Sequence, residues 1–174
     1  LARGTGAGLA KCTSEAAKLE NNMSAMVRYV DGLTESATTS TEQAQSNLKA
    51  MRTYIQDLST QIPRTTEQIS KMSAALGQSG IGADRQMSTG ILRDTAVAAT
   101  AMDLEDDTAG NYMAKWEAAF NFNHDQVMTL MDQINYLGAN NATTAAEIAQ
   151  SVNQAASMGQ IAGVDPSATA GLPP

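Results

Sequence analysis

Apolar or small side chains recur at alternating steps of four and three residues through the first third of this chain, and this spacing constrains the fold more than any other feature. The pattern is interrupted once, by an extra step of four between Ala44 and Leu48. Few segments alternate apolar and polar residues in the way that a half-buried strand does. The sequence therefore predicts an all-α protein, with an extended coiled-coil-like arm or hairpin followed by a multi-helix array.

The apolar seam of the arm is suited to self-association. Its principal residues are Leu19, Met23, Met26, Val30, Leu33, Leu48, Met51, Ile55, Leu58 and Ile62. As one continuous helix, this stretch would be about 65 Å long at about 1.5 Å per residue. Mixed Leu, Met and Ile do not select one oligomer, so we expect a dimer or a trimer. The extra step is a stutter, at which the supercoil should locally unwind.

A helical hairpin is the alternative to a continuous arm. Gly32 and the Thr- and Ser-rich run at residues 34–41 are poor helix formers. Ser40 is followed three residues later by a glutamine, which is typical of the capping box that starts a new helix. This reading predicts a break near residues 36–41 and a seam that packs within one chain.

Pro63 ends the arm in either case, because its ring does not fit a helix interior. We therefore divide the chain into an arm, residues 1–62, and a compact module of five to six short helices, residues 63–174. Capping residues and glycines mark the helices of the module. They run from Thr65 or Thr66 to Gly77, Gln86 to Ala101, Asp103 to Phe120, Asn123 to Gly138, and Thr143 or Thr144 to Gly159. A sixth helix should open at Asp165 and Pro166.

The strongest candidates for core anchors lie in the third of these helices. Trp116 and Phe120 are four residues apart, and Met113 shares their helical face. Because aromatic residues make up only 4% of the chain, such a cluster should dominate the packing of a small core. We expect these three side chains to be buried, with an exposed partner-binding patch as the alternative.

The ionisable residues do not form a catalytic or metal-binding pattern. The densest group consists of Asp103, Glu105, Asp106 and Asp107. It lacks the spacing of a calcium loop, so we interpret it as carboxylates at a helix N-terminus. His124, the only histidine, should face solvent at a helix start, and Cys12, the only cysteine, should be an inert thiol. We expect no enzyme activity, no cofactor and no metal.

The charge balance limits the classes of partner that the chain is suited to bind. The net charge is −7, and nucleic-acid or anionic-membrane binding needs clustered basic residues instead. No apolar run approaches the roughly 20 residues that span a bilayer. We therefore expect no nucleic-acid partner and no membrane segment in this chain.

Three consecutive segments of the module resemble the conserved helical region of phage tail tape measure proteins. The first carries Trp116, Ala119 and Phe120, the second carries Asp125, Val127, Leu130, Asp132, Ile134, Asn135 and Leu137, and the third ends in Gly159, Gly163 and Val164. The resemblance spans roughly residues 58–172 and lies in the order and spacing of these segments. Since the chain begins with Leu1 and stops at Pro174, we also expect it to be a piece of a longer protein.

The resemblance implies a structural function. Proteins of this type lie in the lumen of the virion tail, set its length and template polymerisation of the tail tube protein. Tail assembly chaperones keep them soluble in the host cytoplasm, and they leave the tail before DNA passes. Two other classes stay open: a helical secreted or surface interaction protein, and an enzyme whose catalytic residues lie outside this chain.

Overall fold

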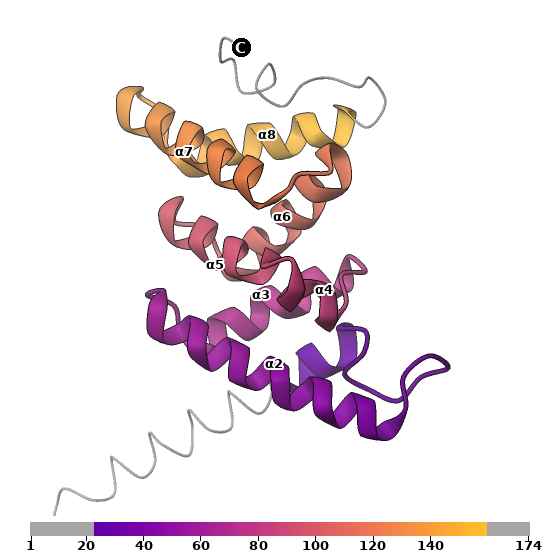
Figure 1. The fold of residues 1–174 in the computed structure, drawn as a ribbon. Helices are drawn as coiled ribbons and strands as arrows, with labels where there is room; N and C mark the ends of the chain where they lie inside the picture. The colour runs from indigo at the N-terminus through magenta and orange to yellow at the C-terminus, as the bar shows by residue number, and fades with distance from the viewer. Residues whose placement is uncertain (1–22, 160–174) are drawn as a thin grey trace, which may run out of the picture.

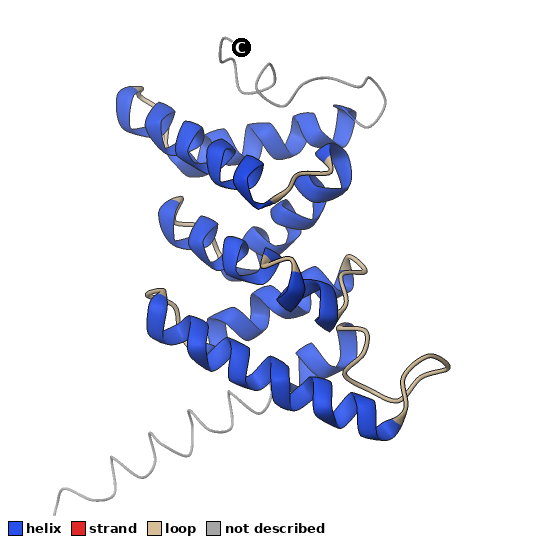
Figure 2. Cartoon of the chain, viewed as in Figure 1, coloured by secondary structure: helices blue, strands red, loops and turns tan. Residues whose placement is uncertain are grey.

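The computed structural model describes residues 23–159, and the described part of the chain is all-α, as the sequence predicts. It contains a helical stretch at residues 23–29 and seven labelled helices. These are α2 (Thr41–Gln61), α3 (Thr66–Gln78), α4 (Ala83–Ser88), α5 (Ile91–Ala101), α6 (Asp106–Phe120), α7 (His124–Asn140) and α8 (Ala145–Gly159). Figure 2 draws no strand in residues 23–159, where the only β-type pairing is an isolated bridge between Ser36 and Thr39.

The helices are stacked in layers from α2 at one end to α7 and α8 at the other (Figure 1). Along this stack, α2 packs on α3 and α4, α5 packs on α3, α4, α6 and α7, and α8 packs on α6 and α7. Helix α6 therefore joins the layers, because it contacts α3, α5 and α8. The predicted boundary between residues 62 and 63 separates α2 from α3 and α4, yet α2 packs on both of these helices.

The arm is a folded-back hairpin, so the continuous-helix reading of it is wrong for residues 23–62. The chain leaves the helix at Val30 and re-enters one at Thr41, after Ser40 accepts a hydrogen bond from the backbone N–H of Gln43 at 3.2 Å. The side-chain amide of Asn47 donates to the carbonyl of Gly32 at 2.8 Å and ties the loop to α2. The poor helix formers between residues 31 and 40 explain the break.

The seam residues pack inside this one chain. Leu19 lies outside the described residues, and Met23 and Leu48 are partly buried against the core. The others are all buried, and they are Met26, Val30, Leu33, Met51, Ile55, Leu58 and Ile62. Self-association of the chain stays a prediction, but these side chains become available for it only if the hairpin opens.

Two glycines expected to end helices lie inside them instead. Helix α3 continues past Gly77, and α7 continues past Gly138. A β-carbon at Gly77 would lie 2.7 Å from the carbonyl oxygen of Tyr29, and one at Gly138 would lie 2.7 Å from the backbone nitrogen of Ala145. Glycine occurs at these positions because another segment approaches the helix backbone closely.

Residues 64–159 contain six helices, where the sequence predicts five. The predicted helix from Gln86 to Ala101 is divided into α4 and α5 at Gly90, whose φ of 75° is left-handed. The predicted cap at Asp103 is also wrong: this residue has φ 52° in the preceding turn, and Glu105 is the N-cap of α6. Gly163, Val164 and the helix opening expected at Asp165 lie outside the described residues.

The predicted starts of α3, α7 and α8 are correct. Thr65 and Asn123 each form a capping box with the glutamine three residues later. The hydroxyl of Thr144 accepts from the N–H of Glu147 at 3.2 Å, and the Glu147 carboxylate accepts from the N–H of Thr144 at 2.8 Å. These local exchanges satisfy backbone donors that a helix leaves free at its first turn.

Candidate interaction site

The aromatic cluster of α6 lies in the core. Trp116 and Met113 are each 1% exposed, while Phe120 is partly buried against the same core. The ring of Trp116 lies 6.0 Å from that of Tyr112, and the ring of Phe120 lies 5.1 Å from that of Phe122 at the turn into α7. Buried in this way, Trp116 stabilises the module and does not form an exposed docking patch.

The crossing of α6 over α3 depends on small side chains. A β-carbon at Gly110 would lie 2.6 Å from Cβ of Ala75 and 2.9 Å from the carbonyl oxygen of Met72. Both distances are shorter than ordinary van der Waals contact, so the two helices meet backbone against backbone at this point. The sequence contains the Ala- and Ser-rich stretch of α3, but nothing in it shows that Gly110 is the residue that faces it.

Buried polar groups hold the short helix α4 in place. Gln86 is fully buried, and its side-chain amide donates to the carbonyls of Ile81 at 2.8 Å and Ser73 at 3.1 Å. Its side-chain oxygen accepts from the Ser73 hydroxyl at 2.6 Å. These bonds satisfy both the NH₂ group and the oxygen of the buried side-chain amide. Gln86 therefore has a structural role.

Arg64 forms a second polar cluster, which the sequence did not predict. Its guanidinium donates to the Asp106 carboxylate at 3.0 Å, the Thr100 hydroxyl at 3.1 Å and the carbonyl of Ala99 at 2.5 Å. It thereby joins the turn after α2 to the end of α5 and the start of α6. Burial raises the pKa of Asp106, and the charge of Arg64 partly offsets that increase.

Two residues of the acidic group, Asp106 and Asp107, lie in the first turn of α6, as the sequence predicts. Asp106 pairs with Arg64, and the Asp107 carboxylate accepts from the N–H of Thr108 at 2.8 Å. Glu105 is the N-cap residue but makes no side-chain capping bond. Within residues 23–159, no group of three or more His, Cys, Asp or Glu side chains is arranged to hold a metal ion.

His124 is not a free cap residue, because it pairs with a carboxylate that the sequence did not single out. Its Nδ1 atom lies 2.8 Å and 2.9 Å from the two carboxylate oxygens of Asp94. Asp94 is 2% exposed, and burial raises its pKa, an increase that the hydrogen bond from His124 partly offsets. The sequence signal for this pair is an acidic residue within the Ala-rich helix α5, where Asp94 follows Arg93.

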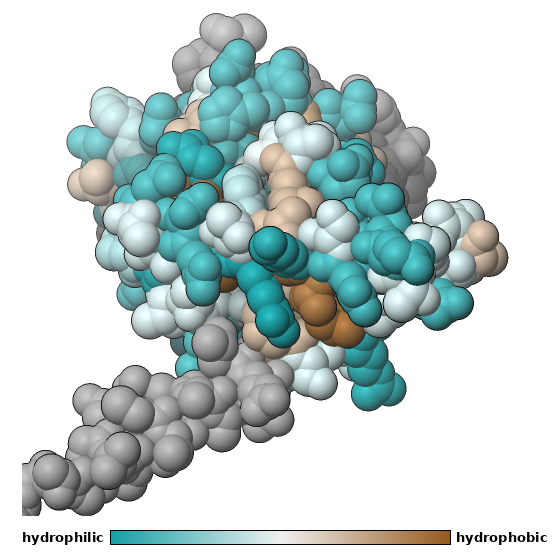
Figure 3. All heavy atoms as spheres, turned by 60° about the horizontal axis from the view of Figure 1, so that its bottom comes forward, coloured by the Kyte–Doolittle hydropathy of each residue, from teal (hydrophilic) through white to brown (hydrophobic). Residues whose placement is uncertain are grey.

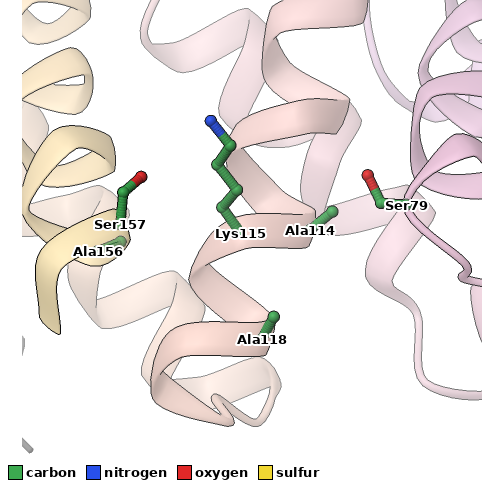
Figure 4. Close-up of a pocket in the computed structure, with 6 residues that line it drawn as sticks. All are labelled: Ser79, Ala114, Lys115, Ala118, Ala156 and Ser157. Atoms are coloured by element: carbon green, nitrogen blue, oxygen red, sulfur yellow. The ribbon is translucent and has the colours of Figure 1, made fainter. Parts of the chain in front are cut away.

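A shallow hollow of about 290 Å³ lies between α6, α8 and the end of α3. Figure 4 shows that mostly small side chains line it, namely Ser79, Ala114, Lys115, Ala118, Ala156 and Ser157. The hollow pairs no nucleophile with a base among these residues, and Lys115 is its single charged group. Its chemistry is that of a helix–helix groove, not that of an active site.

The outer surface at the α2 end is mostly hydrophilic, with only small apolar islands (Figure 3). Among the described residues the large exposed apolar side chains are Tyr29, Tyr136 and Met158. They lie on three different helical stretches, namely residues 23–29, α7 and α8. None of the helices described at residues 23–159 is long and apolar enough to span a bilayer.

Together these features define an all-α structural segment, and the chain belongs to the phage-related minor tail protein family, whose family model matches residues 52–172. The matched region begins within α2 and includes the whole of α3 to α8. A "probable tape measure protein" of Halomonas phage phiHAP-1 is 32% identical over 110 residues. That match covers 60% of this chain and 13% of the phage protein. No solved structure matches the chain.

Proposed function

We propose that this chain is a segment of a tail tape measure protein, which sets tail length and templates assembly of the tail tube. The observation that carries the proposal is the family match across 52–172 together with the likeness to a probable tape measure protein. The partners would be the tail tube protein and the tail assembly chaperones. The segment would enter the tail lumen from the host cytoplasm and leave when DNA is ejected.

The folded-back arm supports a specific version of this role. In a ruler that is one extended helix, each residue adds about 1.5 Å to the length. In this chain α2 packs on α3 and α4, and the seam is used within the hairpin. We therefore propose that the segment is a compact unit within the tape measure, which adds less to tail length than its number of residues would if extended.

An in-frame deletion in the parent gene tests both parts of the proposal. If the arm were extended in the tail, removing Leu19 to Ile62 would shorten the tail by about 65 Å. For a compact unit we expect a shortening well below that value, measured as a distribution of tail lengths by negative-stain electron microscopy. A full 65 Å loss would mean an extended arm, and normal tails after disruption of the whole gene would remove the tape measure function.

A matched variant separates loss of length from loss of folding. Ile55→Asp places a charge at a position that is 2% exposed, so it should unfold the arm without removing any residue. Tails of that variant report the effect of misfolding alone. A shortening by the deletion but not by Ile55→Asp is the result expected of a ruler.

We also propose a structural role without catalysis. The family to which the chain belongs is one of minor tail proteins, and the hollow between α6 and α8 lacks a nucleophile–base pair. The alternative of a helical secreted or surface interaction protein predicts that tail assembly does not require the gene. Tail formation after gene disruption therefore distinguishes the two.

A further inference from the structure

The pair formed by Asp94 and His124 combines a shielded carboxylate with an accessible imidazole. Asp94 is 2% exposed, and each of its carboxylate oxygens has His124 Nδ1 as its hydrogen-bond partner. The side chain of His124 is 47% exposed. The ring can therefore exchange a proton with solvent while its Nδ1 atom faces a carboxylate that water does not reach.

This pair lies at the junction of two parts of the fold. Asp94 belongs to α5, which packs on α3, α4 and α6, whereas His124 is the first residue of α7. Helix α7 otherwise packs mainly on α5 and α8. The hairpin of α7 and α8 thus has a polar attachment to the rest of the module at its first residue.

Among the described residues, few titratable groups lie near Asp94. Arg93 on its own helix favours the carboxylate, as does His124 from α7. The phenol of Tyr54 from α2 is close enough that the Asp94 charge raises its pKa, after the larger effect of burial. Neither a guanidinium nor a phenol ordinarily changes its charge between about pH 5 and 8.

We propose that Asp94 and His124 form a proton-operated latch that holds the α7–α8 hairpin more tightly when the imidazole is protonated. A hydrogen bond between an imidazolium and a carboxylate is stronger than one from a neutral ring. Loss of the proton leaves the Asp94 carboxylate buried with a weaker partner, and the hairpin then opens more often. His124 is the only histidine in the chain, so a response that is lost on its replacement can be assigned to this one imidazole.

Hydrogen exchange on the full chain, followed by mass spectrometry, tests the latch. Protection factors, which already account for the pH dependence of intrinsic exchange, are compared at about pH 5.5 and about pH 8. We expect protection of residues 124–159 to fall by about fivefold or more at the higher pH. Protection of α3 should change much less. An equal change in both regions, or no change in the hairpin, would overturn the proposal.

His124→Gln is the matched control. Glutamine keeps an N–H donor for Asp94 but has no proton to lose in this range. In this variant the hairpin should show the same protection at both pH values while the chain remains folded. A pH response that persists in His124→Gln would assign it to another group and refute the latch. Asp94→Asn should abolish the response as well, which gives an independent check through the other partner.

Discussion

Gly110 and Ala75 bring α6 and α3 into direct backbone contact, since a β-carbon at Gly110 would lie only 2.6 Å from that of Ala75. No other residue type leaves this space. Because α6 also packs on α5 and α8, the position of these layers depends on the contact between two small residues. In this chain, α6 and α3 therefore cross closely at two small residues, without a large aromatic side chain at the point of contact.

Gly110→Ala should destabilise the chain. Alanine is the better helix former by about 1 kcal/mol, but overpacking at a close contact typically costs about 1–3 kcal/mol. The carbonyl of Met72 at 2.9 Å is backbone and moves little, so we expect a net loss measured by urea denaturation. Adding Ala75→Gly to the variant should restore part of it. A more stable Gly110→Ala chain would show that the helices separate without cost.

Trp116→Ala should cost roughly 3–5 kcal/mol, because the side chain is 1% exposed and its removal leaves a large cavity. Phe120→Ala is the matched comparison and should cost less, since Phe120 is only partly buried. As Trp116 is the only tryptophan, its fluorescence should shift to the red when the native chain is denatured. Native emission that is already red-shifted would contradict the burial.

Arg64→Lys should remove most of the hydrogen bonds that join the turn after α2 to α5 and α6. A lysine ammonium retains the charge but does not reproduce the planar set of donors that reaches Asp106, Thr100 and Ala99 together. We expect a loss of about 1–3 kcal/mol. Arg85→Lys provides a control at a more exposed arginine, which pairs with Glu117, and its effect should be within about 0.5 kcal/mol. Equal effects of both substitutions would mean that only charge matters at Arg64.

Ile55→Ala tests whether the seam works within one chain or between chains. Its side chain is 2% exposed, so truncation should cost about 2–5 kcal/mol. For an intramolecular seam, the melting temperatures of wild type and variant should be independent of protein concentration over roughly a hundredfold range. A melting temperature that rises with concentration, and a variant that loses this dependence, would instead support the predicted dimer or trimer. Analytical ultracentrifugation of the same samples reports the oligomeric state directly.

Local signals in the sequence predicted much of the secondary structure. Thr65, Asn123 and Thr144 start helices because each cap and its partner lie three residues apart, within one turn. The break between residues 31 and 40 is likewise a local effect of glycine and of Thr- and Ser-rich composition. The same logic failed at Gly77 and Gly138, where glycine does not end the helix but leaves room for another segment, the backbone of Tyr29 in the first case and that of Ala145, at the start of α8, in the second.

The sequence by itself determined that the chain is helical, where most helices begin, and which tail protein family it resembles. These properties follow from spacing, composition and motifs within short stretches. Only the tertiary structure decided that the seam folds back on itself, that Gly110 meets Ala75, and that Arg64 and His124 find Asp106 and Asp94. Each of these contacts joins residues that are distant along the chain, and helical periodicity shows which face is apolar but not which helix covers it.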